Sequence, residues 1–172
     1  MAVMRFEEAL NAYHKEIYGY LYHLCLAGSA TAPAEEAADL AQDTFERAYQ
    51  AYDRLDPDSN VRAWLYAIAS NAAHDRHKRR QREVNQRPDA PELRSSLAGP
   101  ELALVKAEQQ RWLLDKVAQL PTKQKQALTL RYLQELEYEE IGQVLACSAE
   151  SARANVYQAL KSLRSAAEAV EE

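Results

Sequence analysis

The sequence predicts an all-α fold made of two small helical domains joined by a flexible linker, with a helix-turn-helix as the C-terminal domain. Only four glycines and six prolines occur among 172 residues, which leaves few turn-forming residues for a many-stranded sheet protein. Apolar residues also recur at helical spacing in both halves of the chain. A chain of this length can form one ordinary domain or two small ones.

Residues 4–27 are expected to form the first helix, because turn-forming residues follow at 28–33. A second helix is expected from Ala34 to Leu55, with acidic residues at its positive N-terminal end. The apolar positions at helical spacing are Leu10, Tyr13, Ile17, Tyr20, Leu21 and Leu24 in the first helix, and Ala41, Phe45, Ala48, Tyr52 and Leu55 in the second.

The third helix is expected to start after Ser59 or Asn60, since either residue is a good N-cap. Its apolar stripe consists of Val61, Trp64, Leu65, Ile68 and Ala72. Residues 83–100 contain three of the six prolines and no apolar period, as is typical of a linker. The chain therefore divides into a domain at 1–82, a linker at 83–100 and a domain at 101–172.

The last two helices of the second domain are expected to meet at a tight turn, Ala146-Cys147-Ser148, with Ser148 as the N-cap of the final helix. Pro121, earlier in this domain, fits the first turn of a helix. The short turn is typical of a helix-turn-helix that reads DNA. Helical hairpins that only pack together share the pattern, so both interpretations stay open.

The charge is distributed unevenly along the chain. The net charge is -5, yet residues 61–82 hold six Lys/Arg and one Asp, whereas residues 1–60 hold four Lys/Arg and eleven Asp/Glu. A basic block inside an acidic chain indicates a phosphate-facing surface beside a surface for another partner. The alternative is an ordinary solvated helix face.

Several classes of protein are excluded by what the sequence lacks. Its two cysteines, Cys25 and Cys147, form no CxxC motif, which argues against a disulfide framework or a zinc ribbon. No apolar run approaches the ~20 residues that a membrane-spanning helix needs. We therefore expect a cytoplasmic protein without membrane insertion. No glycine-rich phosphate loop or nucleophile elbow occurs, so we expect neither an enzyme nor a cofactor. His74, Asp75 and His77 lack a further metal ligand and are expected to form polar helix surface.

Three stretches together resemble one family, the extracytoplasmic-function group of bacterial sigma factors. They are Asp-Leu-Ala-Gln-Asp-Thr-Phe-Glu-Arg-Ala-Tyr at 39–49, Val-Arg-Ala-Trp-Leu-Tyr-Ala-Ile-Ala-Ser-Asn-Ala-Ala-His-Asp at 61–75, and the segment 120–142 with Leu-Pro at its start. The resemblance covers about 4–82 and 101–165. It implies a transcription initiation factor that binds core RNA polymerase and promoter DNA. It also implies that an anti-sigma factor binds and inhibits this protein.

The resemblance assigns residues to three surfaces. It implies that the second helix docks on polymerase, that the third helix and the loop before it open the promoter and hold the downstream element, and that the last helix reads the upstream element. The polymerase-docking positions are Asp39, Gln42, Asp43, Glu46 and Arg47. The downstream-element positions are Asp56, Ser59, Asn60, Arg62, Asn71, Arg76, Lys78, Arg79 and Arg80. The upstream-element positions are Ser148, Ser151, Arg153, Asn155, Tyr157, Gln158, Lys161 and Arg164.

The chain departs from the family at two places. Asn155, Gln158 and Leu160 stand where basic residues are common, and Glu137 stands where a helix-capping serine is common. Trp64 could stack on a base, but its spacing with Leu65 favours the core.

Two other functions remain as alternatives. One is a helix-turn-helix regulator with an N-terminal protein-interaction domain, which has no need of the basic block. The other is a decoy that has lost promoter binding.

Overall fold

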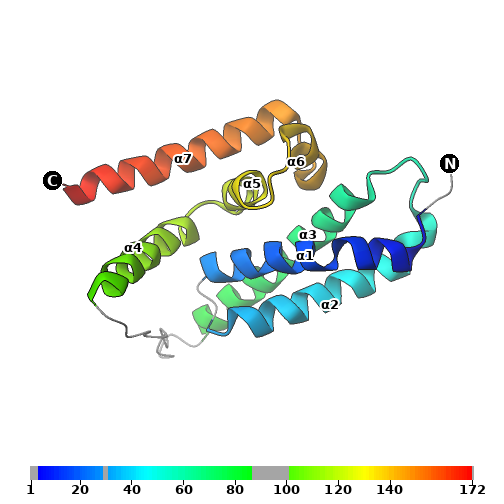
Figure 1. Cartoon of the computed structure of the whole chain (residues 1–172), viewed down its shortest axis with the longest axis horizontal. Helices are drawn as coiled ribbons and strands as arrows, with labels where there is room; N and C mark the ends of the chain where they lie inside the picture. Colours follow the sequence, from blue (N-terminus) through cyan, green and yellow to red (C-terminus); the bar gives the residue numbers. More distant parts are fainter. Residues whose placement is uncertain (1–3, 29–30, 87–100, 172) are drawn as a thin grey trace.

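The computed structural model describes residues 4–28, 31–86 and 101–171, and these residues form helices connected by short turns (Figure 1). The prediction of an all-α fold is confirmed. The elements are α1 (Phe6–Ala27), α2 (Pro33–Ala51), the 3-10 turn η1 (Tyr52–Arg54), α3 (Val61–Gln86), α4 (Glu101–Ala118), α5 (Thr122–Tyr132), α6 (Tyr138–Leu145) and α7 (Ala149–Glu171). Among the described helices, none has the length and apolar character needed to cross a bilayer.

Helices α1, α2 and α3 pack together around a core that contains two fully buried tyrosines, Tyr20 and Tyr66. Their rings meet edge to face with centroids 5.2 Å apart. The hydroxyl of Tyr20 lies 2.8 Å from Oγ of Ser70, so burial leaves this hydroxyl with a partner. Trp64 packs against the same core, as its spacing predicts.

Two helix boundaries in the N-terminal part of the chain differ from the prediction. Helix α2 ends at Ala51 and η1 follows, so Leu55 lies outside the helix. Helix α3 begins after Asn60, whose Oδ1 accepts a hydrogen bond from the Ala63 amide at 3.1 Å. It continues to Gln86 because residues 83–86 contain no proline or glycine, so this part of the predicted linker is helical. Residues 87–100 lie outside the described residues.

The C-terminal domain contains the predicted helix-turn-helix. Ala146 ends α6 with φ 52°, the left-handed conformation typical of a helix C-terminus. Oγ of Ser148 then accepts a hydrogen bond from the Ser151 amide at 3.0 Å and caps α7. Glu137 is the N-cap of α6 and forms a capping box with Glu140. The Glu137 backbone amide donates to the Glu140 carboxylate at 3.1 Å, and the Glu137 carboxylate accepts from the Glu140 amide. The missing serine is thereby compensated.

The two domains lie against each other, which the sequence did not predict. Figure 1 shows the C-terminal helices above the N-terminal three, with α5 and α6 at the contact. Buried residues of both domains, including Leu65, Leu130 and Ile141, belong to one continuous cluster. Helix α3 therefore faces its own domain on one side and α6 on another.

Gly142 should be intolerant of a side chain, and Gly19 provides the matched control. A Cβ at Gly142 would lie 2.7 Å from the carbonyl oxygen of Cys147, whereas a Cβ at Gly19 would meet no atom within 4 Å. We expect Gly142→Ala to lower the free energy of unfolding by about 1–3 kcal/mol. Gly19→Ala should raise it by about 0.5–1 kcal/mol. Urea unfolding followed by circular dichroism measures both, and equal effects would contradict the tight α6–α7 turn.

Candidate functional site

The outer face of α2 carries the predicted docking residues in two adjacent rows. Gln42 and Glu46 form one row, in which the Gln42 amide donates to the Glu46 carboxylate at 2.8 Å. Asp39, Asp43 and Arg47 form the other. In this second row, the Arg47 guanidinium pairs with Asp43 at 2.8 Å. The carboxylates of Asp39 and Glu46 are thus the exposed ones that face solvent without a cationic partner among the described residues.

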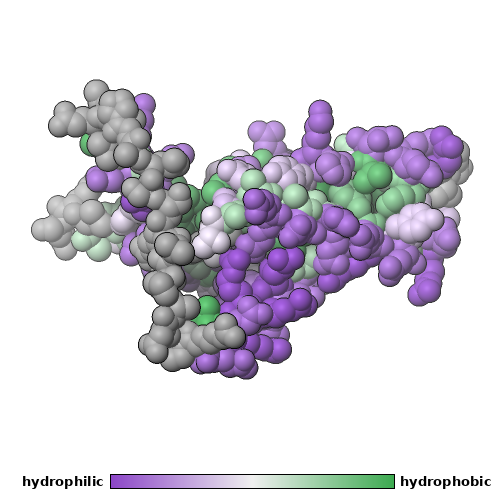
Figure 2. Space-filling model, turned by 90° about the horizontal axis from the view of Figure 1, so that it is seen from below, coloured by the Kyte–Doolittle hydropathy of each residue, from purple (hydrophilic) through white to green (hydrophobic). Residues whose placement is uncertain are grey.

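Gln42 and Glu46 border an apolar groove between α1 and α2 that sequence reasoning missed. The groove is lined mainly by aromatic and aliphatic side chains: Phe6, Leu10, His14, Tyr18, Ala38, Ala41, Phe45, Tyr49 and Gln50 complete its walls. Figure 2 shows a hydrophobic area bordered by hydrophilic residues on the right-hand part of the face formed by these helices. Tyr49 is 68% exposed although its ring contacts Phe6. A large exposed apolar surface with an acidic border is typical of a protein-binding site.

The C-terminal half of α3 presents the basic block to solvent. Lys78 and Arg79 are exposed and form no ion pair within the described residues, and Arg76 is half-buried. Arg80 differs, because its guanidinium pairs with Glu36 of α2 at 2.5 Å. The block therefore has cations that are free to meet phosphate, whereas Arg80 ties α3 to α2.

The loop before α3 uses its polar atoms within the protein. Oδ1 of Asp56 accepts the amide of Asp58 at 3.0 Å, and Oδ1 of Asn60 caps α3. These two oxygens help to shape the loop by accepting backbone amides. Ser59 lies half-buried in the loop, and Asn71 is exposed on α3. The side chain of Asn71 forms no hydrogen bond within the described residues, so its amide is able to contact a base.

Arg62 is held between the domains. Its guanidinium bonds to Glu16 of α1 and, at 3.1 Å, to Glu140 of α6. The Glu16 carboxylate also accepts the Tyr66 hydroxyl at 2.8 Å. Burial opposes the charge on Arg62, but these carboxylates outweigh it and raise the pKa of Arg62. Each guanidinium nitrogen of Arg62 thus donates to a carboxylate, whereas Lys78 and Arg79 are exposed without an ion pair in the described part of the chain.

Helix α7 exposes most of the predicted upstream-element residues on one outward face. Arg153, Tyr157, Gln158, Lys161 and Arg164 are exposed together with the capping residues Ser148 and Ser151. Asn155 is half-buried and its amide donates to the Ser151 carbonyl at 3.0 Å. Arg153 also lies over the ring of Tyr138 in α6, 5.1 Å from its centre. The helix thus presents few cations but several hydrogen-bonding side chains.

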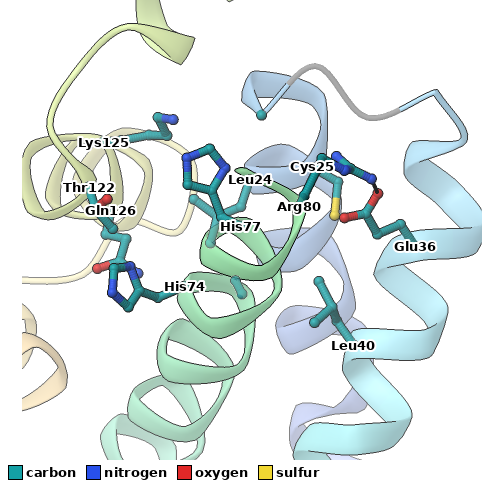
Figure 3. A pocket seen from close by; sticks show the side chains of 12 residues that line it. Leu24, Cys25, Glu36, Leu40, His74, His77, Arg80, Thr122, Lys125 and Gln126 are labelled. Carbon is teal, nitrogen blue, oxygen red and sulfur yellow. Dashed lines mark hydrogen bonds and ion pairs between the residues drawn. The ribbon is translucent and has the colours of Figure 1, made fainter. Parts of the chain in front are cut away.

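A pocket between the domains corrects the expectation for His74 and His77. Both are half-buried and face α5, where Lys125 is only 9% exposed (Figure 3). The Lys125 ammonium donates to the Ala118 carbonyl at 3.1 Å, and burial lowers its pKa. Sequence reasoning placed these histidines on open surface because the covering helix comes from the other domain. Within the described residues, no group of His, Cys, Asp and Glu is suited to hold a metal ion.

Cys25 borders the same pocket as a buried free thiol. Burial, followed by the nearby Glu36 carboxylate, raises the pKa of this thiol to about 12. The thiol therefore stays protonated near neutral pH, as expected of a small buried apolar residue.

Comparison with protein families matches both halves of the chain. Residues 9–83 match the model of Sigma-70 region 2, and residues 110–163 match the model of Sigma-70, region 4. The chain is 30% identical to the RNA polymerase sigma-H factor of Pseudomonas aeruginosa, over 76% of this chain and 72% of that protein. It is 27% identical to the ECF RNA polymerase sigma factor SigW of Bacillus subtilis, over 92% of this chain and 87% of that protein.

Two solved structures share the fold. One is the sigma factor RpoE in complex with the anti-sigma factor NepR from Bartonella quintana, with a TM-score of 0.68 and 21% identity over 93% of this chain and 94% of that one. The other is CnrH in complex with the cytosolic domain of CnrY, with a TM-score of 0.66 and 20% identity over 95% and 88% of the two chains. The likeness extends over both helical domains.

Acidification should destabilise the folded chain through His77. Burial comes first among the causes that lower the pKa of His77, followed by Lys125, His74 and Arg80, while Glu36 acts in the opposite direction. The unfolded histidine therefore takes up its proton at a higher pH than the folded one. Stability is complete above pH ~6.5 and falls as the pH drops toward the lower, folded pKa.

The measurement is thermal unfolding between pH 7.5 and 5.5, where most carboxylates remain ionised. The melting temperature of the wild-type chain should fall across this range, and that of His77→Gln should fall less. Identical pH dependence in the two proteins would contradict the role of His77.

Proposed function

We propose that this chain, which belongs to the extracytoplasmic-function sigma factors and is a transcription initiation factor, docks on core RNA polymerase through α2 and opens promoter DNA with α3. The observation that carries this proposal is the placement of two different surfaces on one small domain. The apolar groove with its acidic border lies on α1 and α2, and the free cations lie at the far end of α3. Each surface suits one partner.

The α2 surface fits a basic, partly apolar protein element. The groove offers apolar area that can be buried on binding, which provides most of the affinity of a protein interface. Asp39 and Glu46 are exposed on the same helix, and within the described residues their carboxylates form no ion pair. Such charges steer a cationic partner and fix its orientation. Asp43 and Arg47 form an ion pair with each other, so they contribute to the shape of the docking surface more than to its charge.

The α3 surface fits the phosphates and bases of an opened strand. Lys78 and Arg79 can contact phosphate on any sequence, because phosphate contacts carry no base information. Asn71, with an amide that both donates and accepts, is suited to contact an unstacked base. The chain is divided into domains at 1–82 and 101–172, and α7 of the second domain contacts the upstream promoter element. The Gln158 side chain is suited to pair with adenine, and Arg153 or Lys161 with guanine.

The remaining properties follow from this function as proposals. The factor acts in the cytoplasm, where the polymerase works, and it selects promoters without catalysing a reaction itself. An anti-sigma factor restrains it, in keeping with the complexes of the two proteins that share its fold. A helix-turn-helix regulator with an N-terminal protein-interaction domain would have no need of the exposed cations Lys78 and Arg79 on α3, so that alternative is not favoured.

Charge reversal on α2 should weaken the complex with core polymerase. Because Asp39 and Glu46 are exposed and unpaired within the described residues, the double variant Asp39→Lys/Glu46→Lys changes charge without breaking a bond to Arg47. We expect the dissociation constant for core to rise about tenfold at physiological salt, and the difference to shrink at high salt.

The matched control is Glu108→Lys/Glu168→Lys, which makes the same change of charge at exposed positions of the other domain. Fluorescence anisotropy titration with core measures both variants. Equal weakening by the control would show that net charge alone, and not the α2 face, governs binding.

The basic block and Asn71 should affect promoter opening differently. Lys78→Ala/Arg79→Ala removes phosphate contacts, so open-complex formation should fall to a similar degree on all promoters and depend less on salt. Asn71→Ala should instead change which downstream-element sequence is preferred. Arg80 is left intact because it holds Glu36.

Permanganate footprinting of thymines with reconstituted polymerase measures both effects, and a Glu168→Ala variant serves as the control. Opening at the wild-type level by Lys78→Ala/Arg79→Ala on every promoter and salt concentration would refute the role of this block.

A further inference from the structure

The pocket beside His77 is small and is lined by four helices (Figure 3). Its volume is about 60 Å³. A buried site needs about 10–15 Å³ to hold one water molecule, so this pocket has room for an ion of several atoms. Pockets that hold a drug-sized organic ligand start at roughly 300 Å³, which excludes a ligand of that size here.

The charged and titratable side chains of the lining are mostly basic. They are Cys25 of α1, Glu36 of α2, His74, His77 and Arg80 of α3, and Lys125 of α5. Arg80 and Glu36 form an ion pair with each other, and the Cys25 thiol stays protonated near neutral pH. The positive charge of Lys125 therefore has no counterpart in the lining, and protonation of the histidines adds to it.

Lys125 itself has fewer partners than its burial demands. Its side chain is only 9% exposed, and it forms no ion pair within the described residues. The ammonium has three donors, of which one meets the Ala118 carbonyl at 3.1 Å. Lysine is almost never buried unless its charge is paired. Burial accordingly lowers the pKa of Lys125, so an anion in the pocket would stabilise its charged form.

Further hydrogen-bonding groups of the lining lack a partner. Thr122 is the first residue of α5, and within the described residues its hydroxyl forms no hydrogen bond. Nδ1 of His74 is buried and also has no partner. Helix α5 has no side-chain cap at its N-terminus, and the backbone amides of its first turn carry partial positive charge. The pocket thus combines donors and positive potential, while its single carboxylate is already paired.

From these observations we infer that the pocket is a binding site for a small inorganic oxyanion of the phosphate or sulfate class. The Lys125 ammonium and the Thr122 hydroxyl donate to its oxygens, and the His77 imidazole donates to it once protonated. The inference does not rest on the proposed function, because these three residues belong to none of the predicted polymerase-binding or DNA-binding sets.

The bound ion should couple to the protonation of His77. Lys125, His74 and Arg80 oppose the charge on His77, and Glu36 favours it. An oxyanion beside the ring favours the protonated form, so it raises the pKa of His77. By linkage, an ion whose own charge stays constant binds more tightly as the pH falls from 7.5 to 6.

Lys125→Met tests the site, because methionine keeps an unbranched apolar side chain and removes the ammonium. The matched control is Lys123→Met, which makes the same change of charge at an exposed position of α5. Thr122→Val is a second variant that removes the hydroxyl and keeps the shape of the side chain. Circular dichroism establishes that each variant is folded, and Thr122→Val decides the matter if Lys125→Met is not.

The measurement is an NMR titration of the full chain with sodium sulfate, and separately with sodium phosphate, at an ionic strength held constant with sodium chloride. We expect saturable shifts of the backbone amides of Thr122 and Lys125 and of the His77 ring in the wild-type chain. The dissociation constant should rise at least about tenfold in Lys125→Met and about threefold in Thr122→Val, and it should change less than about twofold in Lys123→Met. Shifts that do not saturate, or equal affinity in the wild-type chain and the folded Lys125→Met or Thr122→Val variant, would overturn the site.

Two further arms define the ion and its coupling to pH. The affinity for sulfate should increase between pH 7.5 and 6 in the wild-type chain and stay constant in His77→Gln, and the same increase in both would remove His77 from the site. Adenosine monophosphate is the esterified probe and should leave these amides unshifted, because the pocket is too small for a nucleotide. Binding of adenosine monophosphate as tightly as phosphate would overturn the assignment to a free inorganic ion.

Discussion

The structure depends on one constraint, which is that the single helix α3 contacts both domains and solvent at the same time. Its apolar side packs on α1 and α2, and its last turns carry cations into solvent. A further side bonds to the α5–α6 segment through Arg62, Tyr66 and Ser70. Tyr66 shows how the first two demands meet, because its ring is buried against Tyr20 while its hydroxyl reaches both Glu16 and Gln134. A buried hydroxyl without partners would cost about 1–3 kcal/mol, so these bonds fix the position of α3 relative to both domains.

The electrostatic character of the interdomain contact changes along α3. At the Arg62 end, two carboxylates surround one guanidinium. At the other end, His74, His77 and Lys125 approach one another, and the nearby Glu36 is already paired with Arg80. The Glu16 and Glu140 carboxylates favour the contact at the first end, whereas protonation of His77 beside Lys125 opposes it at the second end. The electrostatic interactions between the domains are therefore more favourable at the Arg62 end of α3 than at the His77 end.

The helices could be predicted from the sequence because their signals are local. The N-caps Asn60 and Ser148, the turn at Ala146 and the periodic apolar residues all act within one or two helical turns. The partners of Arg62 could not be predicted in this way, since Glu16 and Glu140 lie 46 and 78 positions away. Similarly, His77 resembles solvent-facing helix surface until α5 covers it. The apolar groove escaped notice because its walls alternate between two helices whose relative rotation the sequence does not give.

The weakly basic last helix limits how tightly the C-terminal domain can bind DNA by itself. Arg153, Lys161 and Arg164 supply few phosphate contacts, and phosphate contacts dominate the affinity of a single DNA-binding module. Two domains that each bind DNA weakly bind it well together only when a third molecule, the third body here, holds them at the correct spacing. Binding of one domain then raises the effective concentration of the other at the DNA. Under the proposed function core polymerase is that third body, and weak DNA affinity in each domain makes promoter recognition depend on it.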